Sequence, residues 1–205
     1  MNILVSMRMV ENSTYPERRD ALSHDWATFF NEHNLLPILV PNAIKNPNRY
    51  FDLAPRGLLL TGGESIGSPG QLSQRDITEM ALISTAIARH IPILGVCRGF
   101  QMLNRYFGGK SVLLPTKSHV GTHSVHLTDG NIYTVNSFHD EGVTEETLAT
   151  ELRPFGRADN GVIEAVRHST LPIVAIQWHP ERSNPASSLD KQLLEEWKKQ
   201  CVLLS

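Results

Sequence analysis

One stretch of the chain decides its fold: Ile93-Leu94-Gly95-Val96-Cys97-Arg98-Gly99-Phe100-Gln101. The apolar residues from Ile91 to Val96 are typical of a parallel strand that is buried on both faces. Residues 100–107 are predicted to form the helix that follows. The stretch therefore joins a buried strand to a helix through a cysteine, as in a doubly wound α/β fold.

Glycine lies two residues before and two residues after Cys97, at Gly95 and Gly99. A side chain that is pushed out at a sharp strand-to-helix turn needs small neighbours, which is the pattern of a nucleophile elbow. The thiol would also lie at the amino end of a helix, where the dipole and the free N–H groups favour a thiolate. The alternative is that Cys97 is a small residue of the hydrophobic core.

A second motif, Ile173-Val174-Ala175-Ile176-Gln177-Trp178-His179-Pro180-Glu181, lies near the carboxyl end. Here a short apolar strand leads to a histidine, and a carboxylate follows two positions later. A nucleophilic cysteine needs a base within hydrogen-bond reach and a third group that orients that base. His179 and Glu181 are candidates for these two roles, unless His179 is an ordinary surface histidine.

A third motif, Thr61-Gly62-Gly63-Glu64, also follows an apolar strand. Glycine at this turn would let backbone N–H groups approach a developing oxyanion, although the turn could be a simple tight loop. In open parallel sheets, ligands bind at the carboxyl ends of the strands. The segment ends therefore place this turn, Cys97 and His179 at one edge of the sheet.

Strand-like and helix-like segments alternate along the chain, which predicts a mainly parallel sheet with helices on both faces. The expected strands are residues 2–6, 36–40, 57–60 and the two described above. The expected helices are residues 17–33, 77–90, 100–107 and a closing helix with Leu189, Leu193, Trp197 and Cys201 at four-residue spacing. Short segments at 111–114, 125–127, 132–135 and 162–166 predict a small antiparallel excursion.

Together, Gly-Val-Cys-Arg-Gly-Phe-Gln around Cys97, Trp-His-Pro-Glu around His179 and the Leu60-Thr61-Gly62-Gly63 turn resemble the class I (triad) glutamine amidotransferases and the gamma-glutamyl hydrolases of the peptidase C26 type. The resemblance implies a flavodoxin-like, doubly wound fold with Cys97 as nucleophile, His179 as general base and acid, and Glu181 as the orienting residue. It also implies an oxyanion hole made by the N–H groups of Gly63 and Arg98, and no metal or organic cofactor.

The resemblance extends to the substrate pocket. It implies that Gln101, one helical turn after Cys97, contacts the glutamyl group. The loop Val135-Asn136-Ser137-Phe138-His139 resembles the pocket loop of free-standing gamma-glutamyl hydrolases, which makes Asn136, Ser137, Phe138 and His139 candidate substrate contacts. The implied substrate is a small-molecule gamma-glutamyl amide, which is hydrolysed through a glutamyl thioester.

The amino-terminal part resembles a narrower group, the gamma-glutamyl-CDP-amidate hydrolases of bacterial capsule synthesis, in the segments Arg8-Met9-Val10-Glu11-Asn12 and Arg18-Arg19-Asp20-Ala21-Leu22. Guanidinium groups suit a diphosphate, so Arg8 and Arg19, with Arg18, are candidate contacts to a nucleotide-linked amine; the alternative for each is a solvated surface charge. The alternative function is that of a glutaminase subunit supplying ammonia to a separate synthase.

Two other classes of protein remain open. His119, His123 and His126 lie close together, and imidazole is a common zinc ligand, but a zinc hydrolase would leave the cysteine elbow unexplained. The same architecture also occurs in non-catalytic binding modules and thiol-stress proteins, which usually lack the His-x-Glu pair.

The 205 residues carry a formal charge of −2, which gives no electrostatic reason to bind nucleic acid or an anionic membrane. We find no apolar run that approaches the ~20 residues of a membrane span.

With two cysteines and no recognisable leader, a reducing cytoplasm is expected. No linker divides the chain, so we expect one domain over residues 1–205.

Overall fold

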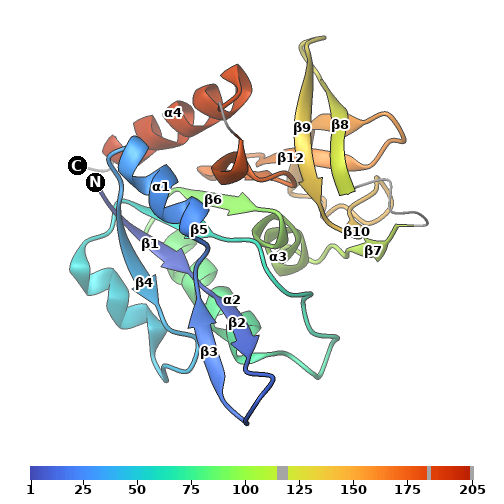
Figure 1. The fold of residues 1–205 in the computed structure, drawn as a ribbon. Coiled ribbons are helices and arrows are strands. Elements are labelled where there is room, and N and C mark those ends of the chain that lie inside the picture. The colour runs from blue at the N-terminus through green and yellow to red at the C-terminus, as the bar shows by residue number, and fades with distance from the viewer. Residues whose placement is uncertain (115–119, 184–185, 204–205) are drawn as a thin grey trace.

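The computed structural model describes residues 1–114, 120–183 and 186–203. Its main feature is a nine-stranded sheet with the strand order β4-β1-β5-β6-β13-β12-β11-β8-β9 (Figure 1). The parallel half contains β4 (Leu36–Val40), β1 (Asn2–Ser6), β5 (Gly57–Leu60), β6 (Ile93–Val96) and β13 (Ile173–Ile176). The antiparallel half contains β12 (Ile163–His168), β11 (Leu152–Ala158), β8 (Val120–Leu127) and β9 (Ile132–Phe138).

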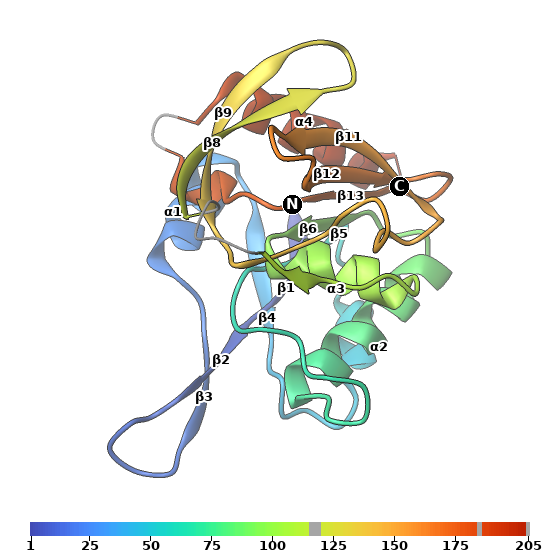
Figure 2. The same cartoon turned by 90° about the vertical axis from the view of Figure 1, so that its right-hand side faces the viewer.

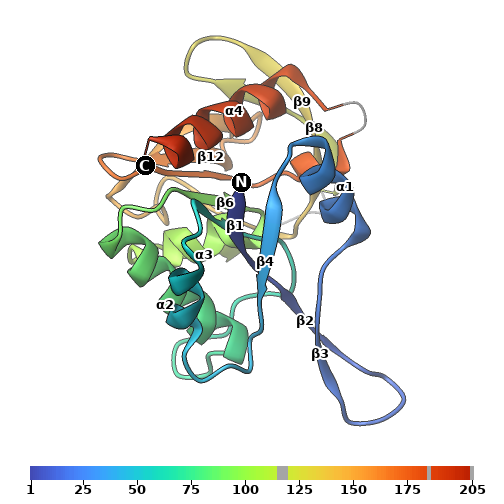
Figure 3. The same ribbon diagram turned by 90° about the vertical axis from the view of Figure 1, so that its left-hand side faces the viewer.

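Helices cover both faces of the parallel half (Figures 1 and 3). Strand alternation explains this, because Ile3 and Val5 of β1 pack in one apolar cluster and Leu4 packs in the other. The first cluster includes α1 (His24–Glu32) and α4 (Ser188–Val202), and the second includes α2 (Gln74–Ala88) and α3 (Arg98–Tyr106). The predicted doubly wound α/β fold is therefore confirmed.

The predicted helix over residues 17–33 is wrong in its first half. Residues Arg18–Ala21 form strand β3, which pairs antiparallel with β2 (Arg8–Glu11) in a two-stranded hairpin. The helix begins only after Ser23, whose side chain accepts a hydrogen bond from the backbone N–H of Asp25 and so caps α1. Figure 2 shows the hairpin projecting from the body of the molecule.

Other elements differ less from the prediction, and each difference has a local cause. Helix α2 begins before Ile77, because Ser73 and Asp76 form a reciprocal capping box. Strand β11 was not predicted; it contains Pro154, and its pairing with β12 shifts register at this point. The antiparallel strands extend the main sheet, and a separate small ribbon pairs β7 (Val112–Leu113) with β10 (Glu141–Gly142).

Two short 3₁₀ helices complete the described elements, η1 (Pro47–Leu53) after β4 and η3 (Pro180–Arg182) after β13. Within the described ranges, none of the helices combines the length and the apolar character that crossing a membrane requires.

The turn between β6 and α3 depends on close backbone packing at its two glycines. A Cβ atom on Gly99 would lie 2.3 Å from the carbonyl oxygen of Leu60 on β5. A Cβ atom on Gly95 would lie 2.8 Å from the carbonyl oxygen of Gly99. Both distances are far below van der Waals contact, so the strand, the turn and the helix approach one another only because these residues lack side chains.

We predict that Gly99→Ala destabilises the fold by on the order of 1–3 kcal/mol, because the new methyl group meets a backbone atom that cannot move aside alone. Urea or thermal unfolding followed by circular dichroism measures this effect. Ser84→Ala, on the exposed face of α2, is the matched control and should leave the free energy of unfolding nearly unchanged. A Gly99→Ala protein as stable as the control would contradict the packing argument.

Candidate active site

The three sequence motifs meet at one edge of the sheet. Strands β5, β6 and β13 are parallel neighbours, so the residues that follow them emerge side by side. These are Gly62 and Gly63 after β5, Cys97 after β6, and His179 a few residues after β13. The convergence expected from the ends of the segments is present in the structure.

Cys97 occupies a strained turn. Its backbone has φ 53° and ψ −105°, a region that residues with a side chain rarely adopt and that costs about 1–3 kcal/mol. Its N–H donates a 2.8 Å hydrogen bond to the carbonyl oxygen of Ile176, and its own carbonyl accepts from the N–H of Gln101 at 3.2 Å. The turn therefore fixes the sulfur between the β6–α3 junction and the end of β13.

His179 links the sulfur to a carboxylate. Its Nδ1 lies 2.7 Å from Oε1 of Glu181. Its ring lies beside Cys97, because a Cβ atom on Gly62 would be 2.7 Å from His179 Cε1 and 3.5 Å from Cys97 Cβ. Burial alone would lower the pKa of His179, but the hydrogen bonds and charges of Cys97 and Glu181 outweigh it and raise the pKa from 6.5 to about 9. The imidazolium form is thus favoured at neutral pH beside both groups.

Asn136 holds the backbone of His179 in place. Its Oδ1 accepts a 2.9 Å hydrogen bond from the His179 N–H, and its Nδ2 donates to the His179 carbonyl oxygen at 2.8 Å. The same Nδ2 lies 3.2 Å from the hydroxyl of Ser183. The sequence predicts Asn136 as a substrate contact; in the structure its amide holds the backbone of His179, so this residue also positions the histidine.

A buried cluster of charges joins the glycine turn to the cysteine elbow. Arg75 is fully buried and donates to the carbonyl oxygen of Thr61 at 2.7 Å and to that of Gly62 at 3.3 Å. Its Nε donates to Oε1 of Glu79 at 2.8 Å, and the other oxygen of Glu79 accepts from Arg98.

Arg98 binds a second carboxylate, Asp76, so its buried side chain spans two acidic residues of α2. Burial alone would raise the pKa of Glu79, but the charges of Arg75 and Arg98 outweigh it and hold the pKa below its usual range. The cluster thus keeps the backbone N–H groups of Gly63 and Arg98, the predicted oxyanion hole, in a fixed relative position.

The remaining predicted pocket residues differ in their surroundings. Gln101 and His139 are buried, and both are tied to the carbonyl oxygen of Glu141, at 3.1 Å from Gln101 Nε2 and 2.8 Å from His139 Nδ1. Ser137 is fully buried. Phe138 is half exposed, and its ring centroid lies 5.7 Å from that of His179.

The two arginines predicted to bind a diphosphate lie on the two strands of the hairpin and have different surroundings. Arg8, at the start of β2, lines a small cavity together with Gly62 and His179. Arg19, on β3, donates to Glu17 and to the hydroxyl of Tyr15, both within the hairpin. Arg18 lies 3.3 Å from Glu11 on the facing strand, and neither Arg18 nor Arg19 lines a cavity next to Cys97 or His179.

Two cavities flank the sulfur and the imidazole. The first, next to Cys97, is lined by Gly63, Glu64, Ser65, Cys97, Arg98, Gln101, Phe138, His139, Asp140 and Glu141. The second, next to His179, is lined by Arg8, Ala21, Leu22, Ser23, Trp26, Thr61, Gly62, His179, Glu181 and Arg182. We call these the acyl cavity and the histidine cavity.

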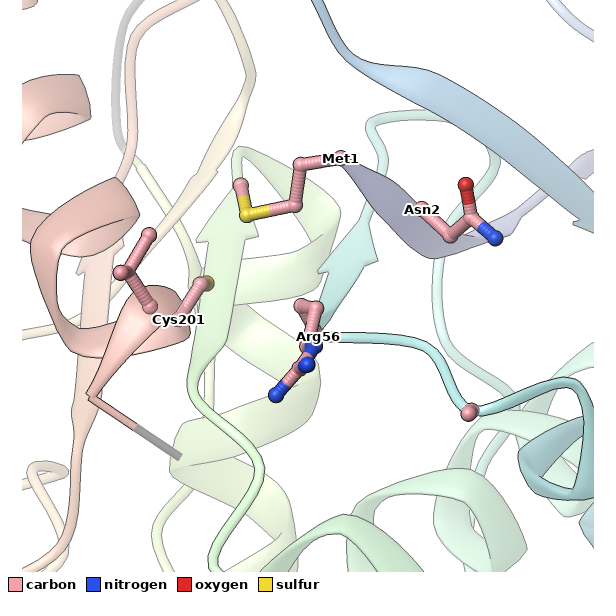
Figure 4. Close-up of a pocket in the computed structure, with 6 residues that line it drawn as sticks. Met1, Asn2, Arg56 and Cys201 are labelled. Carbon is pink, nitrogen blue, oxygen red and sulfur yellow. The ribbon is translucent and has the colours of Figure 1, made fainter. Parts of the chain in front are cut away.

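Another cavity, of about 300 Å³, lies at the opposite edge of the sheet, near the amino ends of β1 and β5 (Figure 4). Met1, Arg56 and Cys201 are among its lining residues. The lining is mainly apolar, and burial raises the pKa of the Cys201 thiol to about 12, which makes this thiol a poor nucleophile. Cys201 is therefore not a candidate nucleophile.

The histidines considered as zinc ligands do not form a common site in the described ranges. His126 lies 2.5 Å from Asp159 at the surface, whereas His123 lies 3.4 Å from the buried carboxylate of Glu164. His119 lies outside the described residues. No group of three metal-ligating side chains occurs within the part of the chain that the structure describes.

Sequence reasoning missed several residues that shape the site. Gln177 is buried, and its Nε2 lies 3.8 Å from the sulfur of Cys97. The buried charges of Arg75, Asp76 and Glu79 were also missed, although the four-residue spacing of Arg75 and Glu79 on one helix is a signal that could have indicated an ion pair.

A family model and sequence relatives both connect the chain with gamma-glutamyl hydrolases. The family model for Peptidase C26 matches residues 3–181. The chain is 33% identical over 203 residues to a gamma-glutamyl-CDP-amidate hydrolase of Campylobacter jejuni, covering 96% of this chain and 97% of that protein. It is 29% identical over 206 residues to a gamma-glutamyl-gamma-aminobutyrate hydrolase of Escherichia coli, covering 81% of this chain and 80% of the relative.

Solved structures share the fold at lower sequence identity. A putative GMP synthase protein from Thermoplasma acidophilum superposes with a TM-score of 0.72 at 20% identity, covering 98% of this chain and 94% of that chain. A glutamine amidotransferase from Thermotoga maritima gives a TM-score of 0.64 at 18% identity, with 99% and 87% of the two chains covered.

We predict that His179 titrates near pH 9 in the native protein and that Glu181→Gln lowers its pKa, because the neutral amide stabilises the imidazolium less than the carboxylate does. The pH dependence of the His179 ring signals in an NMR spectrum measures both values. Arg49→Met, an exposed substitution on η1, is the control and should leave the titration unchanged. Titration of His179 near or below pH 6.5 in the unaltered protein would contradict the proposed arrangement.

Proposed function

Since the chain belongs to the peptidase C26 family, we propose that it is a hydrolase of gamma-glutamyl amides that works through a glutamyl thioester on Cys97. One observation carries this proposal: Cys97 lies at a strained elbow beside the ring of His179, which is in turn bound to Glu181. This is the nucleophile, base and orienting group that acyl transfer requires.

In the first step, the Cys97 thiolate attacks the δ-carbonyl carbon of the substrate, forming a C–S bond while the carbonyl oxygen takes the negative charge. The N–H groups of Gly63 and Arg98 are suited to stabilise this oxyanion, and each such donor typically contributes on the order of 3 kcal/mol. The C–N bond then breaks, and the His179 imidazolium gives its proton to the departing nitrogen.

In the second step, water replaces the amine. Neutral His179 takes a proton from this water as it attacks the thioester carbonyl, and Glu181 stabilises the imidazolium that forms. The C–S bond breaks, glutamate leaves and the thiolate–imidazolium pair is restored. These steps require no metal ion or organic cofactor.

For the leaving amine, we propose a nucleotide-linked amidate, so that the products are glutamate and a cytidine diphosphoramidate that serves surface polysaccharide synthesis. The similarity to the Campylobacter jejuni hydrolase, which extends over nearly the whole of both chains, supports this choice. Arg8 beside the histidine cavity also supports it, because a guanidinium suits a phosphate. Two unpaired thiols, Cys97 and Cys201, fit a reducing cytoplasm.

A second candidate is a glutaminase that passes ammonia to a separate synthase. Its support is the structural similarity to glutamine amidotransferases, which at this level of identity concerns the fold alone. The two candidates differ in their need for a partner, because a free-standing hydrolase releases the amine directly into solution.

Glutamate release from a panel of substrates distinguishes these functions. We expect the isolated protein to turn over gamma-glutamyl-CDP-amidate with a kcat/KM at least about tenfold above those for gamma-glutamyl-gamma-aminobutyrate and glutamine, since phosphate contacts add binding energy. Glutamine turnover that appears only after a synthase is added would favour the glutaminase. Equal turnover of all three substrates would overturn the proposed nucleotide preference.

We predict that Cys97→Ser lowers kcat by at least about 10³-fold while the unfolding temperature stays within a few degrees of the unaltered value. The serine hydroxyl has nearly the same shape as the thiol but is a far weaker nucleophile without a stronger base. Steady-state kinetics and thermal unfolding measure the two effects, and Cys201→Ser is the control for general loss of a thiol. Substantial turnover by Cys97→Ser would contradict the thioester mechanism.

A further inference from the structure

The position of the proton donor decides where the leaving group must lie. The acyl cavity is lined by Cys97 and Gln101, and the histidine cavity is lined by His179. A glutamyl group bound to the sulfur would therefore occupy the acyl cavity. The departing nitrogen takes its proton from His179, so it must face the histidine cavity.

The histidine cavity has a volume of only about 20 Å³, which is room for little more than a water molecule. It can hold the leaving nitrogen in the first step and the attacking water in the second. The rest of a large leaving group must then extend across the rim of this cavity, so the residues at the rim determine which amines are accepted.

Two guanidinium groups lie at this rim, and neither is engaged in a tight ion pair. The Nε of Arg182 is 3.7 Å from both Asp25 and Glu181, and Glu181 is already bound to His179. Arg8 forms no ion pair with any residue in the described ranges. Both side chains are thus available to a negatively charged ligand.

The backbone next to Arg8 is tied to the active site. The N–H of Met9 donates to Oε1 of Glu64 at 3.2 Å, and the other oxygen of Glu64 accepts from Arg75 at 3.0 Å. The Cβ of Arg8 also lies only 3.1 Å from the place that a Cβ on Gly63 would take. The base of the projecting hairpin is therefore fixed beside the glycine turn.

An aromatic ring that lines the acyl cavity also contacts Arg182 and His179 of the histidine cavity. Phe138 is 50% exposed, although it neighbours the catalytic edge, and Arg182 Cζ lies 4.8 Å from its ring centroid. An exposed ring paired with a guanidinium is a suitable surface for stacking a nucleobase, which binds aromatic faces and arginine planes.

We infer that Arg8, Arg182 and Phe138 form a leaving-group subsite for a nucleoside diphosphate, with the two guanidinium groups on the phosphates and Phe138 against the base. This inference rests on the proposed function, and it assigns specificity for the leaving amine to residues outside the Cys97–His179–Glu181 triad. Arg182 and Phe138 adjoin His179, so the subsite and the proton donor act on the same leaving group.

Kinetics with two leaving groups test the subsite. We expect Arg182→Met and Arg8→Met each to lower kcat/KM for gamma-glutamyl-CDP-amidate on the order of 10- to 100-fold, mainly through KM, while kcat/KM for gamma-glutamyl-p-nitroanilide changes less than about threefold. Arg182→Lys should restore part of the loss, because it keeps the charge but not the planar fork. Phe138→Leu should lower kcat/KM for the nucleotide substrate more than for gamma-glutamyl-gamma-aminobutyrate, whose leaving group has no ring to stack.

Arg49→Met, which removes an exposed guanidinium far from both cavities, is the matched control and should behave as the unaltered protein with both substrates. Equal losses on the two substrates would show that Arg182 acts only by supporting Glu181, and would overturn the subsite. Unchanged kinetics of the arginine variants with the nucleotide substrate would overturn it as well, while leaving the proposed function in place.

Binding to the Cys97→Ser protein separates the subsite from the proposed function. Isothermal titration calorimetry should detect CDP binding, weaker binding of inorganic pyrophosphate, and loss of CDP binding after Arg8→Met or Arg182→Met. CDP binding that the arginine variants lose, combined with no turnover of gamma-glutamyl-CDP-amidate by the unaltered protein, would support the subsite and refute the proposed substrate. Absence of CDP binding would overturn the subsite.

Discussion

The edge of the sheet that carries Cys97 and His179 depends on a buried set of ion pairs in which Arg75 and Arg98 face Asp76 and Glu79. All four side chains are almost fully removed from solvent, and their formal charges cancel. Because a buried charge without its partner is strongly unfavourable, about 3–5 kcal/mol when one member of a pair is lost, the four groups hold one another in a single arrangement.

This arrangement connects backbone segments that the sheet alone leaves independent. Arg75 binds the carbonyl oxygens of Thr61 and Gly62, and Arg98 begins the helix after Cys97. The turn after β5 and the turn after β6 thereby become one rigid unit. The proposed oxyanion hole, with one N–H from each turn, needs such a connection, because its effect depends on donors that are fixed before the reaction.

Parallel register explains how residues distant in sequence come together. Ile176 of β13 pairs with Val96 of β6, so the next residues, Gln177 and Cys97, are neighbours, and the Gln177 amide reaches the sulfur. His179 follows only two positions later, which keeps its ring close to the same sulfur. The two hydrogen bonds between the Asn136 amide and the His179 backbone then fix that backbone, and Glu181 fixes the ring.

The sequence was sufficient for the parallel half of the fold, because β1, β5, β6 and β13 are short apolar runs that end in recognisable turns. It failed for residues 18–21, where tertiary pairing with β2 overrides a helical spacing that continues into α1. It also missed β11, because Pro154 lies within this segment and proline in a run of residues argues against a strand.

For the site, sequence reasoning located Cys97, His179, Glu181 and the glycine turn, because each follows a strand end. It could not show that the Arg98 side chain faces α2, since that direction depends on two acidic partners brought near by packing. For the same reason it could not show that the Asn136 amide binds the backbone of His179, or that Arg19, unlike Arg8, is paired within the hairpin.

The aromatic residues around the histidine cavity have a practical consequence. Trp26, from α1, lines this cavity. It is one of three tryptophans in the chain. The other two, Trp178 and Trp197, are buried within the same apolar layer. Indole emission is sensitive to nearby charge and water, so the chain carries its own optical reporter of whether the space beside the imidazole is empty or filled.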